Sequence, residues 1–424
     1  MRLVEQHRID RHDSRFAALD ATAFAGKNLY NAALYHTRQA FIFRAERIRY
    51  EALARLMRET DAYRALPAKV AQWVLKQVSA AWDSYFTALS AWKADPSRFL
   101  GRPRLPKYLD KQGRNLLTYT LQAVSRPLLR QGIIQPSGLS IQVQTRQTAV
   151  QQVRIVPHGT HYTVEVIYEQ PITPASLDPA LVAAVDIGVN NLAALTSNLP
   201  GFAPRLINGR PLKALNQRYN KRRAQLQAQL PQGRHTSRRL DAIADKRNRR
   251  ITDYLHNASR AIINLLVQHR IGTLVVGHNP DWKQRVQLGR RTNQTFVSIP
   301  HARFIAMLTY KTELAGIRVV VREEAHTSKV SFLDHEPVQH HDVYAGKRIA
   351  RGLFRASDGT LINADVNGAY NIGRKAAPEA FAPGGHGWVV QPVRMQLPNR
   401  NHTRANPAWC HKTLEAGILY ERRS

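Results

Sequence analysis

The stretch "LVAAVDIGVNNLAAL" (residues 181–195) decides the fold class of this 424-residue chain. Its first part, 181–185, is a continuous apolar run, which is typical of a strand buried on both faces of an α/β sheet. Asp186 ends that run, and a second strand is expected after Gly188. A carboxylate at the end of a buried strand lies at the mouth of such a sheet, where ligands bind. The sequence therefore predicts an α/β domain that begins near residue 179 and carries Asp186 at its edge.

The segments that follow fit the same domain. "GTLVVGHN" (272–279) and "IRVVVREE" (317–324) are expected to be further strands. Between them, Ser298 and Pro300 indicate the start of a helix that Gly316 ends. Residues 211–270 are expected to form two helices rich in Lys and Arg. We therefore predict one α/β domain over 179–376 with a basic helical insertion.

The N-terminal part has a different pattern. Helices are predicted over 29–57 and from Pro67 onward, which gives a helical module over 21–94. Between about 115 and 170 apolar and polar residues alternate, which favours a small β-barrel or curled sheet. We assign 1–20 and 95–178 to this β-barrel domain. Residues 377–424 lose periodicity and are expected to form a tail.

Composition restricts the partners. The chain has 62 Lys and Arg against 30 Asp and Glu, a formal charge of +32 and a pI near 10.9, so a nucleic acid is the expected partner. The single cysteine, Cys410, excludes an internal disulfide framework. No apolar run is long enough to cross a membrane, and the start has no apolar leader. We expect a cytoplasmic protein without a membrane partner.

Three acidic positions are candidates for metal ligands. Asp186 ends one strand, Asp365 begins a predicted short helix in "INADVNGAYNIGRK" (362–375), and Glu323 and Glu324 end another strand. Three converging carboxylates form a ligand set for two Mg²⁺ ions that act on a phosphodiester. Each aspartate by itself is more often a cap or turn residue. The glutamates could alternatively neutralise nearby arginines.

These motifs resemble the nuclease domain of the TnpB family, the accessory proteins of small insertion sequences, which are also similar to type V CRISPR effector nucleases. The resemblance covers about residues 180 to 375. It implies a RuvC-like (RNase H-like) fold, an N-terminal recognition lobe with a small barrel, and a prokaryotic, nucleoid-associated protein. It also implies RNA-guided DNA cleavage, with a guide noncoding RNA and with double-stranded and single-stranded DNA as partners. The motifs that carry it, in order, are "DIGVNNLAAL", "GHNPDWKQ", "IPHARFIAMLTYKTELAGI", "EEAHTSKVSFLD" and "KRIARGLFRASDGTLINADVNGAYNIGRK".

The chain departs from the family pattern in two places. The second motif commonly ends its strand in Glu, whereas this strand runs into Gly277, His278 and Asn279. Because adjacent strands end about 5 Å apart, a glutamate at the end of "IRVVVREE" can take the missing position, and both Glu323 and Glu324 remain candidates. The insert over 325–362 also lacks the four cysteines of the family's zinc ribbon, so no zinc is expected and other contacts must hold it.

Several basic and hydroxyl side chains are candidates for nucleic-acid contacts, each of which could equally be a solvated surface residue. They lie in the 95–114 loop, the basic insertion and the motifs around the acidic residues. They are Arg102, Arg104, Lys107, Arg222, Arg223, Arg247, Arg249, Arg250, Lys283, Thr327, Ser328, Lys329, Lys347, Arg348, Arg351 and Arg355.

The leading hypothesis is an RNA-guided, Mg²⁺-dependent DNA endonuclease in which base pairing supplies specificity. The alternatives are a catalytically silent RNA-guided DNA-binding protein and, less favoured, a transposase that joins DNA ends. The missing glutamate of the second motif discriminates between the active nuclease and the silent binding protein. An active nuclease requires Glu323 or Glu324 to approach both Asp186 and Asp365.

Overall fold

A computed structural model of the chain describes residues 1–279, 298–381, 390–397 and 411–412. The chain divides into two compact units, one made of residues 1–170 with the short strand at 411–412, and one that begins at residue 171. Each unit is described by itself. Among the described residues, no helix is long and apolar enough to cross a membrane.

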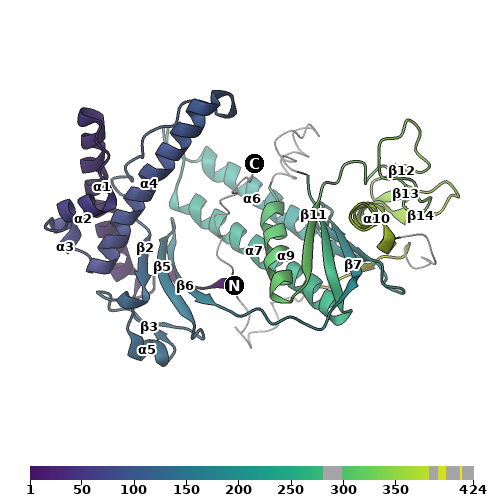
Figure 1. Cartoon of the computed structure of the whole chain (residues 1–424), viewed down its shortest axis with the longest axis horizontal. Helices are drawn as coiled ribbons and strands as arrows, with labels where there is room; N and C mark the ends of the chain where they lie inside the picture. Colours follow the sequence, from purple (N-terminus) through teal and green to yellow (C-terminus); the bar gives the residue numbers. More distant parts are fainter. Residues whose placement is uncertain (280–297, 382–389, 398–410, 413–424) are drawn as a thin grey trace. The chain divides into compact units, whose positions relative to one another are not determined.

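The first unit combines helices with an antiparallel sheet around one core (Figure 1). Its sheet has the order β16-β1-β6-β5-β2, and a separate pair joins β3 and β4. No pairing joins the edge strands β16 and β2 within the described ranges, so closure into a barrel stays a prediction. The bounds are β1 (Arg2–Asp10), α1 (Phe16–Arg44), α2 (Tyr50–Met57), α3 (Asp61–Arg64), α4 (Ala68–Ala94), β2 (Leu117–Thr120), α5 (Arg126–Arg130), β3 (Ile133–Ile134), β4 (Val143–Gln144), β5 (Val150–Pro157), β6 (His161–Glu169) and β16 (His411–Lys412).

The single helix predicted over 29–57 is wrong. Helix α1 ends at Arg44 because Ala45 adopts a left-handed conformation, with φ of 53°, and its N–H bonds back to the carbonyls of Ala40 and Phe41. Such a cap usually uses glycine. The sequence therefore carried no clear stop signal there, and the chain resumes as α2 at Tyr50.

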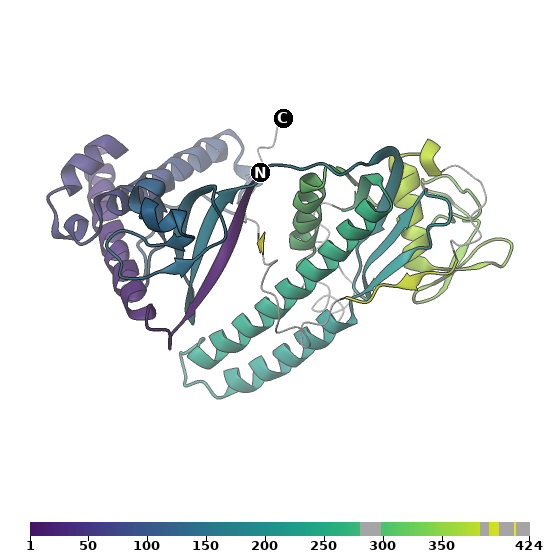
Figure 2. The same cartoon turned by 90° about the horizontal axis from the view of Figure 1, so that it is seen from below.

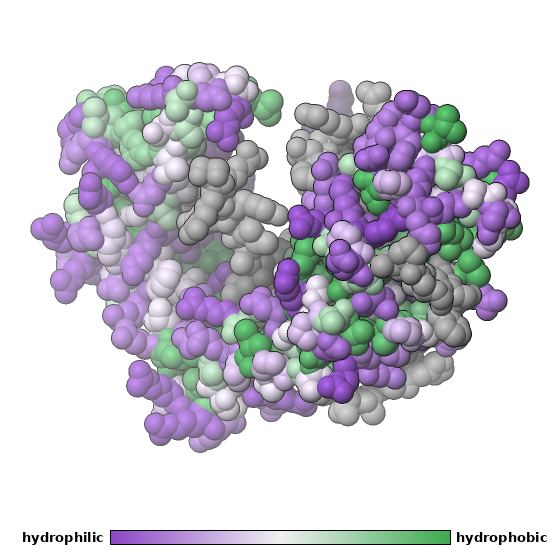
Figure 3. Space-filling view, turned by 45° about the vertical axis from the view of Figure 1, so that its right-hand side comes forward, coloured by the Kyte–Doolittle hydropathy of each residue, from purple (hydrophilic) through white to green (hydrophobic). Residues whose placement is uncertain are grey.

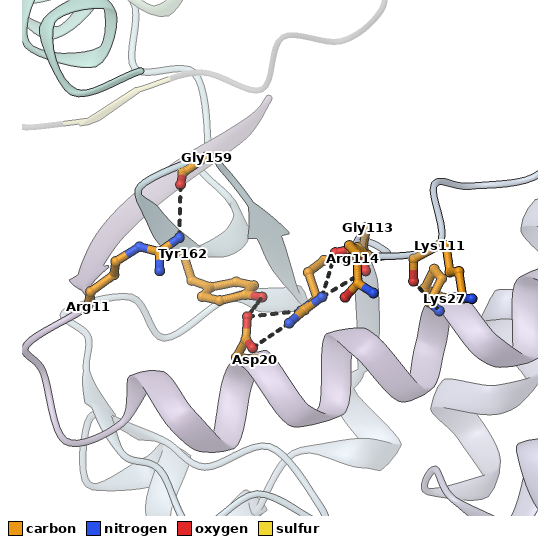
Figure 4. A network of polar contacts seen from close by, with 9 residues as sticks. Arg11, Asp20, Lys27, Lys111, Gly113, Arg114, Gly159 and Tyr162 are labelled. Atoms are coloured by element: carbon orange, nitrogen blue, oxygen red, sulfur yellow. Dashed lines mark hydrogen bonds and ion pairs between the residues drawn. The ribbon is translucent and has the colours of Figure 1, made fainter. Parts of the chain in front are cut away.

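A polar network joins α1 to the sheet and to the 95–114 loop of the same unit (Figure 4). Asp20 accepts hydrogen bonds from the guanidinium of Arg114, at 2.7 and 2.9 Å, and from the hydroxyl of Tyr162 at 2.8 Å. The bonds from Arg114 are the main cause of the lowered pKa of Asp20. Further along α1, Lys27 donates to the carbonyl of Lys111 at 3.0 Å. The network fixes the basic loop on the helical module.

The second unit is an α/β domain with a six-stranded sheet of order β11-β10-β7-β8-β9-β15. Strands β7, β10 and β11 run parallel, and β8 pairs antiparallel with both β7 and β9. A smaller sheet has the order β12-β13-β14. The bounds are β7 (Asp178–Asp186), β8 (Asn191–Ser197), β9 (Arg205–Asn208), α6 (Arg210–Ala228), α7 (Arg238–Gln268), β10 (Ile271–Gly277), α9 (His301–Leu314), β11 (Arg318–Arg322), β12 (Lys347–Ala350), β13 (Leu353–Arg355), β14 (Leu361–Asn363), α10 (Ala364–Ala376) and β15 (Val393–Arg394).

Helices cover both faces of this sheet. Helices α7 and α9 pack with Ala183 and Val185 in one core, and α10 packs with Val182 and Ala184 in the other. The alternation of side chains along a strand therefore places Asp186 on the α10 face. Helices α6 and α7 form the basic insertion and lie side by side as a long hairpin (Figure 2). The predicted tail contributes β15 to the edge of this sheet.

Candidate acidic active site

The ends of β7 and β10 and the start of α10 position the acidic site. Val185 pairs with Val276, so Asp186 on β7 and Gly277 on β10 follow at the same edge of the sheet. Helix α10 approaches this edge closely: a Cβ on Gly368 would lie 2.9 Å from Oδ2 of Asp186. Glycine at 368 therefore lets the helix that carries Asp365 approach Asp186.

Glu324 reaches the same place from β11, one strand further along the sheet. Gly277 pairs with Arg322, so Glu324 extends two residues beyond that pair. A Cβ on Gly277 would lie 2.5 Å from Oε1 of Glu324 and 2.8 Å from its Cγ. The side chain of Glu324 therefore lies over the glycine, in the space that a side chain on β10 would take.

Burial and mutual repulsion shift the pKa values of these carboxylates. Burial raises the pKa of Asp186 well above its usual range, and the negative charges of Glu324 and Asp365 raise it further, whereas Arg348 lowers it. Burial also raises the pKa of Glu324 to about 7. Desolvated, mutually repelling carboxylates are a feature of functional sites. Asp186, Glu324 and Asp365 thus form one electrostatic group, and we call these three residues the acidic triad.

The contacts of Glu324 separate it from its neighbour Glu323. Glu323 is exposed, whereas Glu324 is largely buried. The Oε1 atom of Glu324 is buried and has no hydrogen-bond partner among the residues that the structure describes. Burying a carboxylate oxygen without a hydrogen-bond donor is unfavourable, because the oxygen loses its bound water and gains no replacement. A cation at the acidic triad would compensate for that loss.

Two asparagines hold the acidic triad in place, and the sequence analysis missed both. Asn191 donates from Nδ2 to Oδ2 of Asp365 at 2.8 Å. Asn279 accepts the backbone N–H of Glu324 at 3.0 Å through its Oδ1. Asn279 lies two residues after Gly277, in the motif where the sequence lacks the usual glutamate. That position serves as a support for Glu324.

The chemistry of these residues suits a divalent cation, because hard cations prefer carboxylate oxygens. The triad supplies three carboxylates, and one of them, Glu324, has a buried oxygen without a hydrogen-bond partner among the described residues. Across the described parts of the chain, no group of three or more His, Cys, Asp or Glu side chains lies close enough together to hold a metal ion as it stands. A further acidic residue after β10, Asp281, was a less favoured candidate for the missing second-motif ligand because it follows its strand by several residues. It lies outside the described residues, as does Lys283.

Amide groups rather than thiolates hold the insert after Glu324. Asn371 on α10 is buried and donates from Nδ2 to the carbonyls of Thr327 and Val330, at 2.9 and 2.8 Å. Asn367, also buried, donates to the carbonyl of Val330 and accepts the N–H of Phe332. Glu336 accepts two further backbone N–H groups. These are the contacts that the cysteine-free sequence requires.

Two of the side chains predicted to contact nucleic acid make hydrogen bonds within the fold. Thr327 is buried, and its hydroxyl donates to the carbonyl of Glu324 at 2.9 Å, so it shapes the turn after the triad. Arg247 was expected to project outward, but it is half-buried and donates to Asn216 at 2.8 Å and to the carbonyl of Ser298 at 2.7 Å. Both side chains are committed to the fold.

The remaining candidate side chains that the structure describes are exposed. They lie on the 95–114 loop of the first unit and, in the second unit, on the helical hairpin, in the segment after Glu324 and around β12 and β13. In the view of Figure 3, hydrophilic side chains cover most of the surface. Arg249 pairs with Asp245 at 3.4 Å. The exposed set is Arg102, Arg104, Lys107, Arg222, Arg223, Arg249, Arg250, Ser328, Lys329, Lys347, Arg348, Arg351 and Arg355.

Further cations lie beside the loop after Asp186. Lys213 on α6 donates from Nζ to Oδ1 of Asn190 at 2.9 Å. Burial lowers the pKa of Lys213, and the positive charges of Arg351 and Arg210 lower it further. Positive charge therefore gathers next to the acidic triad. Lys213 and Arg210 were not among the predicted site residues, because the sequence does not show that the start of α6 lies beside the loop that follows Asp186.

Comparison with known proteins agrees with this fold. Residues 161–283 match the family OrfB_IS605, described as a probable transposase, and residues 301–372 match the family described as Cas12f1-like, TNB domain. No curated protein sequence matches the chain. The solved complex of Cas12f1 with sgRNA and target DNA is similar with a TM-score of 0.53 and 13% identity, over 83% of this chain and 81% of that one. The structure of the mini-RNA-guided endonuclease CRISPR-Cas_phi3 gives 0.45 and 10%, over 91% and 93%.

Over residues 161–283 and 301–372 the chain is therefore similar to the OrfB_IS605 (TnpB) and Cas12f1-like families. The fold, over most of the chain, is similar to that of the solved Cas12f1.

Proposed function

We propose that this protein is an RNA-guided, Mg²⁺-dependent DNA endonuclease of the transposon-associated TnpB type. The observation that carries the proposal is the position of Glu324, whose buried carboxylate lies over Gly277 and raises the pKa of Asp186. The acidic triad is neither exposed to solvent as a whole nor neutralised by several arginines, since Arg348 is the one cation among the described residues that is found to lower the pKa of Asp186. This arrangement favours an active nuclease over a silent binder.

In this proposal, Asp186, Glu324 and Asp365 hold two Mg²⁺ ions, which would activate water and stabilise the leaving oxygen of the phosphodiester. Asn191 orients the carboxylate of Asp365, and Asn279 fixes the backbone at Glu324. Arg348, Lys213 and Arg351 attract the phosphate backbone toward the site. The N-terminal unit with its small β-barrel and helices serves as the recognition lobe.

The proposed partners are a guide RNA and target DNA, because the similar solved complex contains sgRNA and target DNA. Pairing between guide and target would supply sequence specificity, and the exposed cations of both units would grip the phosphates. This role fits a protein with a formal charge of +32. A cytoplasmic, nucleoid-associated location follows from the same role.

The decisive experiment measures DNA cleavage by the protein purified with the RNA encoded beside its gene, in Mg²⁺, on a library of target sequences. Asp186→Asn, Glu324→Gln and Asp365→Asn should each abolish cutting, and the adjacent Glu323→Gln should retain it. Loss of cutting in Asp186→Asn with full activity in Glu324→Gln would refute the assignment of Glu324. Guided binding without cutting in the unaltered protein would establish the silent binder, and DNA joining without RNA would establish the transposase.

A further inference from the structure

A pocket in the first unit lies apart from every residue assigned above. It is formed between the segment that follows α1 and the middle of α4, and its volume is about 230 Å³. Its lining combines cationic, aromatic and hydroxyl side chains, which is the mixture that binds polar, planar ligands. The lining residues are Arg47, Ile48, Arg49, Tyr50, Ser79, Trp82 and Asp83.

The walls of this pocket are fixed by the fold. The left-handed Ala45 and the bond from the N–H of Glu46 to the carbonyl of Ala40 turn the chain back toward α4. Trp82 is buried, donates its indole N–H to the hydroxyl of Thr37 at 2.8 Å, and stacks on Phe86. The pocket is therefore preformed, so binding would order little of the protein.

The polar groups of the pocket are not all satisfied. The hydroxyl oxygen of Ser79 is buried and has no hydrogen-bond partner within the part of the chain that the structure describes. Arg47 at the rim pairs with Asp83. Arg49 is exposed, and no acidic partner for it is found among the described residues. A ligand with a hydrogen-bonding edge and a negative charge would complement both Ser79 and Arg49.

We propose that this pocket binds one unstacked nucleobase of a single-stranded nucleic acid, with the adjacent phosphate on Arg49. The volume equals that of roughly eight waters at about 30 Å³ each, which suits one base and excludes a duplex. The base edge would bond to the hydroxyl of Ser79, and its face would contact Tyr50, since every base has a face that aromatic rings bind. This inference depends on one part of the proposed function, namely that the chain binds nucleic acid.

The test compares two leucine substitutions on the same helix. Ser79→Leu removes the hydroxyl and fills the pocket, whereas Ala80→Leu adds the same side chain at the next, exposed position. The full-length protein is mixed, in EDTA, with single-stranded oligothymidylate or oligouridylate that carries one 4-thio base. Ultraviolet cross-linking with peptide mapping locates the base, and fluorescence anisotropy gives the affinity. The DNA and RNA arms show which strand the pocket prefers.

We expect cross-links to Tyr50 in the unaltered protein and in Ala80→Leu. Ser79→Leu should lose them and bind about 5- to 150-fold more weakly, the range for losing one stacked base. If Ser79→Leu does not fold, Ser79→Ala removes the hydroxyl alone and should weaken binding in the same direction.

Three results would overturn the inference. They are equal affinity of Ser79→Leu and the unaltered protein, cross-links only outside the pocket, or displacement of the pocket cross-link by polyglutamate as readily as by unlabelled oligonucleotide. Because EDTA prevents cutting, these results leave the proposed nuclease intact. Failure to bind any oligonucleotide would instead remove both proposals.

Discussion

Glu324 and Gly277 share one space at the edge of the sheet: the side chain of Glu324, from β11, occupies the position that a Cβ on Gly277, from β10, would need. The strand that lacks the acidic residue is therefore also the strand that leaves room for it. This relationship gives a physical basis for a site in which the carboxylate comes from the neighbouring strand.

Gly277→Ala should reduce DNA cleavage at least about tenfold and destabilise the fold by roughly 1–3 kcal/mol. The new methyl group would lie 2.5 Å from Oε1 of Glu324 and 2.6 Å from Cδ1 of Ile372, so Glu324 must move. Cleavage rates and thermal unfolding measure the two effects. Gly101→Ala, at a glycine with open space around it, is the matched control and should change neither.

Exchanging the two residues should restore activity that either single change removes. In Gly277→Glu with Glu324→Gly, the carboxylate returns to β10 and the glycine moves to β11, so the crowded space again holds one side chain. We expect each single variant to lose cutting about a hundredfold or more, as for groups that stabilise developing charge, and the double variant to recover part of it. Additive losses in the double variant would show that the two positions do not substitute for each other.

The acidic triad should make the metal-free protein less stable as pH rises. The pKa of Glu324 is about 7 when folded against an ordinary 4.5, so the folded state binds more protons between these values and its stability falls through that window. At 1.36 kcal/mol per unit, Glu324→Gln should stabilise the metal-free protein by up to roughly 3 kcal/mol at pH 8, with the gain vanishing near pH 4.5. Thermal unfolding in EDTA, with Glu323→Gln as the control, measures it.

Magnesium should have the opposite pH dependence. Because the ion requires deprotonated carboxylates, its stabilising effect should be larger at pH 8 than at pH 5.5, and Glu324→Gln should remove most of it. The readout is the shift in Tm on adding Mg²⁺ at each pH. An equal shift in the unaltered protein and in Glu324→Gln would argue against metal binding at the triad.

The buried amide of Asn371 should be essential for the insert. Asn371→Leu keeps the size but leaves the carbonyl of Thr327 without its amide donor, which costs about 1–3 kcal/mol for a buried group. We expect faster proteolysis within 325–362 and a lower Tm. Gln227→Leu, at an exposed amide on α6, should leave both unchanged.

Much of the second unit could be predicted from its sequence, because buried parallel strands leave continuous apolar runs and their ends point to one edge. That rule placed Asp186 at the end of its strand, and Asp365 lies in the first turn of a short helix, where the sequence indicated one. The rule could not choose between Glu323 and Glu324, since alternation assigns them to opposite faces and only the packing of Val320 with the α10 core shows which face is occupied. Asn191 and Asn279 were missed because their hydrogen bonds join segments far apart in the chain.

In the first unit, the break after α1 escaped prediction because Ala45 adopts a conformation that glycine normally marks. The hydrogen bonds that Thr327 and Arg247 make within the fold could not be predicted for a related reason. A threonine or an arginine in a basic segment gives no sign of whether its polar atoms bond to its own backbone neighbours or to a ligand. Those bonds depend on the three-dimensional proximity of Glu324, Asn216 and Ser298.

The amide-held insert has one more consequence. Carboxamides on α10 bond to backbone atoms of the insert, and the insert contains no thiol, so this part of the chain should tolerate oxidants and chelators that would unravel a cysteine-bound ribbon. Treatment with a chelator should therefore leave this scaffold folded.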